Sequence, residues 1–169
     1  ELVKENINIV KKDWDAFETS WNFSKHPLIR HFTKIADAYE EWHNECSSRY
    51  DKLKSNESSI NQIFIELYGL NGEMSSEVED KDVEASCHHA NCTRDIKTLI
   101  SYAVGCMFGR YSLDASGLVY AGGEWDASKY KTYPADADNI IPICDDEYFD
   151  DDIVGRFVKF VELVYGKDT

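Results

Sequence analysis

Residues 93–126, TRDIKTLISYAVGCMFGRYSLDASGLVYAGGEWD, contain the feature that most constrains the fold, an apolar repeat with helical spacing. Apolar residues recur three or four positions apart, which is typical of a helix with a buried face. They are Ile96, Leu99, Ile100, Ala103, Met107 and Phe108. Thr93 suits the start of such a helix and Gly109 its end. The pattern predicts a central core helix at about 94–108, covered on nearly every side, with Ile100 in the core.

Three further stretches carry helical patterns. Residues 27–54 and 60–67 each have apolar residues on one face, and the polar stretch 56–59 between them suits a break. This arrangement predicts two helices joined as an antiparallel hairpin. Residues 153–165 form an amphipathic pattern, and the acidic run at 145–152 suits the first turn of that helix. The polar stretch between the hairpin and the core helix reads as a loop with one short helix.

Two short segments, 117–121 and 139–143, have the composition of β-strands, and Pro142 favours a sheet edge. The predicted fold class is mainly α: a helical hairpin and a C-terminal helix around a buried central helix, with a small β-hairpin-like element. The length predicts a single domain, residues 1–169. Residues 1–23 are rich in Trp and Phe, so we expect an N-terminal arm packed on the body; the alternative is an arm that belongs to a neighbouring domain.

Four blocks of the sequence, in the same order, resemble a family of large adenine-specific DNA methyltransferases. They are DWDAFETSWNF at 13–23, NQIFIELYGLNGEM at 61–74, RDIKTLISYAVGCMFGRYSLD with GLVYAGGEWD at 94–126, and DNIIPICDDEYFDDDIVGRFVKFVELVYG at 138–166. The family comprises the PglX-type enzymes of BREX phage-defence systems, which are similar to single-chain restriction-modification proteins. The resemblance covers nearly the whole chain.

The resemblance implies a helical spacer, an internal piece of a longer enzyme between the methyltransferase core and the C-terminal recognition region. The parent enzyme would be cytoplasmic, use S-adenosylmethionine and act on DNA, and its partners could include other phage-defence subunits. The residues themselves offer no catalytic parts: there is no Pro-Pro pair for a loop that grips a flipped base, and no glycine-rich turn in a strand-turn-helix context. We therefore expect no catalytic and no cofactor-binding residue in this segment.

The net charge of −14 argues against strong DNA binding by the segment, because affinity for a phosphate backbone depends on cationic side chains. Residues 1–57 are the least acidic part, with 9 basic and 11 acidic side chains. Lys25, Arg30 and Lys34 are the candidates for contacts with a DNA backbone, although the interleaved glutamates also fit an ordinary solvated face. The alternatives in other classes are a stand-alone acidic interaction module, such as a DNA mimic, and a small enzyme whose site the sequence does not reveal.

The cluster Cys87-His88-His89-Ala90-Asn91-Cys92 has metal-ligand chemistry, but a structural zinc site needs four ligands and no second pair of suitable spacing follows. We expect a loop without metal. The five cysteines are odd in number and lack a repeated spacing, which favours reduced thiols. No run of 18 apolar residues indicates a membrane span.

Overall fold

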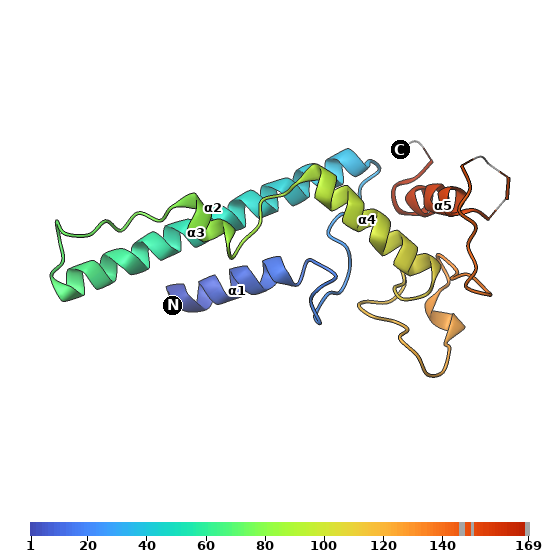
Figure 1. Ribbon diagram of the computed structural model, residues 1–169, viewed down its shortest axis with the longest axis horizontal. Coiled ribbons are helices and arrows are strands. Elements are labelled where there is room, and N and C mark those ends of the chain that lie inside the picture. Colours follow the sequence, from blue (N-terminus) through green and yellow to red (C-terminus); the bar gives the residue numbers. More distant parts are fainter. Residues whose placement is uncertain (146–147, 150, 168–169) are drawn as a thin grey trace.

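Helices account for all the regular structure in residues 1–145, 148–149 and 151–167, the part of the chain that the computed structural model describes (Figure 1). In order they are α1 (Leu2–Trp14), α2 (Ile35–Tyr68), α3 (Asp80–Glu84), α4 (Cys92–Met107), a 3₁₀ turn (Ala127–Lys129) and α5 (Ile153–Tyr165). The prediction of a mainly α fold is confirmed. None of these helices is both long and apolar enough to cross a membrane, as judged over the described residues.

Helix α2 is a single helix of 34 residues, where the sequence predicts two. The expected break at 56–59 does not occur, and α2 begins at Ile35 rather than near Pro27. Asn56 is buried, and its amide donates hydrogen bonds to Glu5 Oε2 and Asn6 Oδ1, both at 2.9 Å. Because these partners on α1 satisfy the side chain of Asn56, this polar residue can lie inside a continuous helix. At 1.5 Å per residue, α2 is about 50 Å long.

The helical hairpin of the structure therefore consists of α1 and α2, which pack side by side and run in opposite directions (Figure 1). One side of α1 contributes Ile9 and Val10 to a small apolar cluster. The buried members of this cluster come from α2, α3 and the loop after α3; they are Tyr50, Leu53, Val83 and Cys87. The short helix α3 is the one predicted for the polar stretch before the core helix.

Helix α4 confirms the predicted core helix, with two differences. Its N-cap is Asn91 rather than Thr93, and the Asn91 side chain accepts a hydrogen bond from the backbone N–H of Arg94. The buried residues are Asp95, Leu99, Tyr102, Ala103, Cys106 and Met107. Ile100, by contrast, is 41% exposed, so the prediction that it lies in the core is wrong. Neighbouring elements cover α4 on one wide face only, and Ile100 lies one residue, or about 100°, round from Leu99.

Helix α5 packs against α4 and closes the main core with Phe160, which is fully buried. The hydroxyl of its last residue, Tyr165, donates a hydrogen bond to the carbonyl of Leu28 at 2.5 Å. This bond links α5 to the connection between α1 and α2. Asp152 caps the start of α5 by accepting a hydrogen bond from Gly155 N at 2.6 Å, as the acidic run predicts. Three other acids of that run, Asp146, Glu147 and Asp150, lie outside the described residues.

Apart from the 3₁₀ turn, the segment from Gly109 to Asn139 is irregular, and the predicted strands at 117–121 and 139–143 are absent from the described residues. The backbone of the first segment bonds to scattered partners, with Gly117 N donating to Ser24 O and Val119 N to Arg110 O. Isolated bonds of this kind satisfy the backbone without a strand ladder. Asn139 has a positive φ of 60°, which interrupts the second segment.

Aromatic packing holds this irregular segment on the end of α4. The rings of Trp125 and Tyr130 stack with centroids 4.4 Å apart, and the Tyr130 hydroxyl donates to the Gly109 carbonyl at 2.6 Å. Gly109 has φ +76°, and a Cβ built there would lie 2.7 Å from the Trp125 ring. Both the backbone conformation and the close ring therefore require glycine at this position.

Candidate interaction surface

The three predicted DNA-contact residues lie just before α2 and differ in their surroundings. Lys25 and Lys34 are exposed. Arg30 is instead held by α2: its guanidinium donates to Glu41 Oε2 at 2.7 Å and to both carboxylate oxygens of Glu45 at 2.8 and 2.9 Å. These hydrogen bonds raise the pKa of Arg30 and lower that of Glu45. Arg30 therefore ties the connection between α1 and α2 to the start of α2, and only the two lysines are open to a phosphate.

The loop from Cys87 to Cys92 spreads its possible ligands apart. Cys87 is fully buried, and burial raises the pKa of its thiol to about 11, whereas Cys92 is exposed in the first turn of α4. The ring of His89 packs on Tyr50, with centroids 4.0 Å apart. Among the described residues, no group of three or more His, Cys, Asp or Glu side chains is arranged to hold a metal ion.

Asp13 is the residue that gives this loop a structural role, and sequence reasoning missed it. Its carboxylate is almost completely buried and accepts hydrogen bonds from both the backbone N–H (3.2 Å) and Nδ1 (2.7 Å) of His88. The guanidinium of Arg49 lies 3.8 Å from its other oxygen. Asp13 thereby joins α1, α2 and the loop before α4. The sequence does not reveal this role, because an Asp among charged neighbours such as Lys11 and Lys12 is typical of an exposed surface.

The buried thiols do not have the character of nucleophiles. Burial raises the pKa of both Cys46 and Cys106 to about 12, so both remain protonated near neutral pH. A thiol becomes a nucleophile only as its thiolate, which needs a cationic or polar setting that lowers the pKa. Both residues instead lie in the main apolar core beside Trp42 and Leu99. Their role in this segment is packing.

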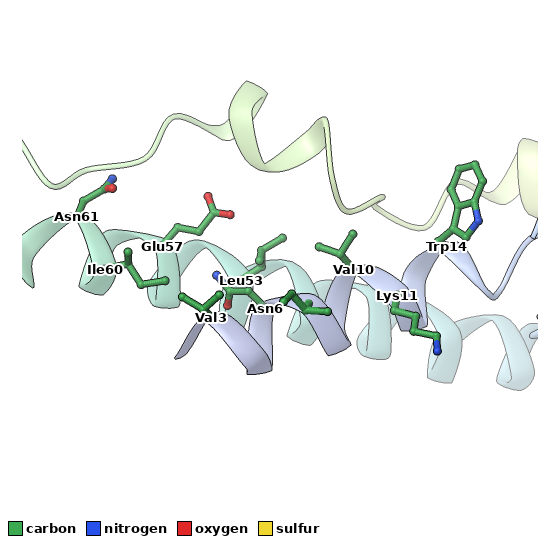
Figure 2. A pocket seen from close by; sticks show the side chains of 10 residues that line it. Val3, Asn6, Val10, Lys11, Trp14, Leu53, Glu57, Ile60 and Asn61 are labelled. Atoms are coloured by element: carbon green, nitrogen blue, oxygen red, sulfur yellow. The ribbon is translucent and has the colours of Figure 1, made fainter. Parts of the chain in front are cut away.

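A groove lies on the surface between α1 and α2, and we call it the α1–α2 groove (Figure 2). It has a volume of about 690 Å³ and is lined by Val3, Asn6, Ile7, Val10, Lys11, Trp14, Leu53, Glu57, Ile60 and Asn61. Val3, Ile7 and Trp14 of this set are four and seven residues apart on α1, so they form an exposed apolar face next to the one that packs on α2. Val3, Ile7 and Trp14 are each more than half exposed, at 57, 61 and 53%.

The apolar surface continues past the groove along the last turns of α2, from Ile63 to Tyr68. Phe64 and Tyr68 stack on each other here, and Leu67 is 71% exposed. Ile65 is the one buried member of this stretch. An exposed apolar strip of this extent is uncommon on a protein that functions alone, and such strips mark sites where another surface packs.

The sequence of the chain is similar to two known adenine-specific methyltransferases. No protein-family profile matches the chain. It is 45% identical over 177 residues to the adenine-specific methyltransferase PglX of Lacticaseibacillus casei (strain Zhang), with the whole chain matched. It is 39% identical over 191 residues to the adenine-specific methyltransferase BrxX of Escherichia coli O9:H4 (strain HS), with 99% of the chain matched. The resemblance to PglX-type methyltransferases is confirmed.

The match to PglX covers the α1–α2 groove, the core and the C-terminal helix together, since it extends over 100% of the chain. The chain spans only 15% of the length of PglX and 16% of that of BrxX. A PglX-type protein is therefore more than six times as long as this segment.

Proposed function

We propose that this segment is a non-catalytic positioning module of a longer, S-adenosylmethionine-dependent and adenine-specific DNA methyltransferase. In this proposal it sets the distance between the catalytic and target-recognition regions of an enzyme of phage defence or restriction-modification. We call that enzyme the parent protein. The partners of this segment are then the remaining domains of the parent protein. The parent protein binds the cofactor and the DNA.

The continuous helix α2 is the observation that carries this proposal. Its first half packs into the main core through Trp42 and Cys46, and its middle packs into the second cluster through Tyr50 and Leu53. A helix of about 50 Å that is fixed at two places along its length resists bending and can hold two attached bodies at a set distance. A strut of this kind needs no reactive group of its own.

The electrostatics support a module that leaves DNA binding largely to other parts of the parent protein. The segment carries a net charge of −14, which opposes contact with phosphates. Lys25 and Lys34 are exposed in the connection between α1 and α2, so the proposal allows them a secondary contact with a DNA backbone. A net negative charge is compatible with a spacer, whereas a DNA-reading module would need a cationic surface.

A matched pair of substitutions in the parent protein tests the positioning role. Leu99 is fully buried in α4, so Leu99→Asp places an unpaired carboxylate in the core and should unfold the segment. Ile100→Asp adds the same charge at an exposed position and is the control. We expect the first variant to lose adenine methylation, and the second to keep a rate within about twofold of the wild type.

Cofactor binding, measured by calorimetric titration, separates positioning from catalysis. The Leu99→Asp parent protein should retain its affinity for S-adenosylmethionine, and the isolated 169-residue chain should give no heat of binding. Loss of cofactor affinity in the variant, or a stoichiometric site in the isolated chain, would place this segment in the catalytic domain. Full methylation by the Leu99→Asp protein would contradict a positioning role.

A further inference from the structure

The α1–α2 groove and the end of α2 form one continuous apolar surface. On α1 the exposed residues Val3, Ile7 and Trp14 lie along one face. On α2 Phe64 and Leu67 follow Ile60 at helical spacing on the same face, so they extend the apolar surface beyond the groove. Figure 2 shows Val3 and Val10 of α1 near Leu53 and Ile60 of α2, where the two helices meet. A helix of 13 residues is about 20 Å long, so the groove alone offers space for nearly four turns of a third helix. Two antiparallel helices that expose such a face lack the partner that would bury it.

The two edges of the groove carry opposite charge. Lys11 lines the α1 edge, and Lys4 lies two turns earlier on the same side of the helix. Glu57 lines the α2 edge and is half-buried. Within the described part of the chain, none of these three side chains forms an ion pair inside the segment. Charges of opposite sign on the two rims of an apolar groove select the orientation of an amphipathic helix, as the flanking charges of coiled coils do.

We propose that an amphipathic α-helix from the remaining polypeptide of the parent protein docks in the α1–α2 groove and completes a three-helix bundle. Its apolar face covers Ile7 and Phe64, and carboxylates on one flank lie opposite Lys11. The PglX-type relatives supply the occupant, because about 85% of their length lies outside the matched segment. This inference rests on the proposed positioning role, since a docked helix is what would fix a neighbouring domain to the strut.

Photo-crosslinking in the parent protein tests the docked helix. The photoreactive residue p-benzoylphenylalanine replaces Ile7 in one variant and Phe64 in another, and it replaces Asn8, which is exposed on the outer face of α1, in the control. Irradiation should crosslink the first two variants within one polypeptide, at monomer mass. Mass spectrometry should locate both crosslinks in one helix outside the 169 residues, with apolar residues three and four apart.

Two results would overturn the docked helix. Crosslinked species at twice the monomer mass would show that a second copy covers the groove. A crosslinking yield at Ile7 and Phe64 no higher than at Asn8 would show that the surface is open to solvent.

Thermal unfolding provides a second readout that does not depend on crosslinking. Ile7→Glu should shift the unfolding midpoint of the isolated chain little, because Ile7 is 61% exposed there. In the parent protein the same change should lower the midpoint of the transition that includes this segment by several degrees, because the side chain is buried under the docked helix. The matched control is Asn8→Glu, which should be silent in both. Equal shifts in the two proteins would contradict docking.

The outcomes separate the two proposals. Crosslinks to a single helix, together with full methylation by the Leu99→Asp protein, would retain the docked helix and reject the positioning role. Loss of methylation in that variant, with crosslinking at the level of Asn8, would retain the positioning role and reject the docked helix.

Discussion

The indole of Trp42 in α2 donates its Nε1–H to the buried carboxylate of Asp95 in α4, with 3.1 Å between nitrogen and oxygen. The same carboxylate accepts from the backbone N–H of Asn91 at 2.9 Å and from the Arg94 guanidinium at 2.8 Å. Asp95 is 2% exposed, so its charge is balanced by these three donors rather than by water. This one carboxylate sets the start of α4 and fixes that helix against α2.

Replacing Asp95 should therefore destabilise the segment strongly. Asp95→Ala leaves the Trp42 and Asn91 donors and the Arg94 guanidinium without their common acceptor, which should lower the free energy of unfolding by about 3 kcal/mol. The control is Asp37→Ala, an exposed acid in the first turn of α2, which should cost less than about 1 kcal/mol. Chemical denaturation followed by circular dichroism measures both. A similar small effect for the two variants would mean that Asp95 does not join the helices.

His26 should make stability depend on pH. It is 4% exposed, bonds to Thr98 and the backbone N–H of Leu28, and burial lowers its pKa to about 3 from the ordinary value of 6.5. Between these two pH values the unfolded chain binds a proton at His26 and the folded chain does not. The contribution is therefore fully present above about pH 6.5, and it falls by about 1.4 kcal/mol for each pH unit as acid is added.

The variant His26→Gln isolates this effect, because its side chain does not titrate. Its free energy of unfolding should depend less steeply on pH than that of the wild type between about pH 6 and 4, whatever its stability at neutral pH. His31→Gln, at an exposed position, should keep the wild-type slope. Denaturant titrations at several pH values give the slopes, and identical slopes for all three proteins would show that His26 is protonated in the folded state.

The loop from Cys87 to Cys92 should fold without zinc. Purified chain should contain no stoichiometric metal, and a chelator should leave the helical circular dichroism and the melting point unchanged, because loss of a structural zinc could not be silent. Cys92→Ser changes an exposed residue, and the hydroxyl of a Cys87→Ser variant has Asp13 within reach. Both should melt within a few degrees of the wild type. Elemental analysis near one zinc per chain would contradict this prediction.

His88→Ala is the positive control for that loop. It removes the side-chain donor to the buried Asp13 carboxylate, so it should lower the melting point whether or not chelator is present.

Lys25 and Lys34 should contribute non-specifically to DNA binding by the parent protein. Reversing both to Glu should lower affinity uniformly across DNA sequences and reduce the slope of log affinity against log salt by about 2. Arg30→Glu should act differently, because it breaks the contacts with Glu41 and Glu45 and so lowers thermal stability. Salt-dependent binding and melting measurements separate the two effects. A change of the recognised DNA motif in the lysine variant would mean that this region reads bases.

Local patterns in the sequence determined much of this fold. The apolar spacing from Ile96 to Met107 predicts α4, and the pattern from 153 to 165 predicts α5 together with its acidic start. These elements are correct because the signals that start, stop and bury a helix lie within the helix itself. The resemblance of the four sequence blocks to PglX-type methyltransferases is likewise evident from the sequence alone.

Tertiary contacts decided the rest. The polar stretch 56–59 would suit a break in isolation, but Asn56 finds Glu5 and Asn6 on α1, so α2 continues. Whether Ile100 or its neighbour Leu99 faced the core depended on how α2 and α5 lie around α4.

For the candidate interaction surface, too, the sequence predicts some features and the tertiary structure decides the others. The sequence predicts an aromatic-rich arm at 1–23 and no helix there, so the exposed face of α1 that lines the groove with Ile7 and Trp14 is evident only in the structure. The sequence makes Arg30 one of three candidates for a phosphate contact, whereas in the structure its guanidinium is paired with Glu41 and Glu45. A sequence specifies which side chains a helix presents, and the packing of distant segments decides which of them remain exposed.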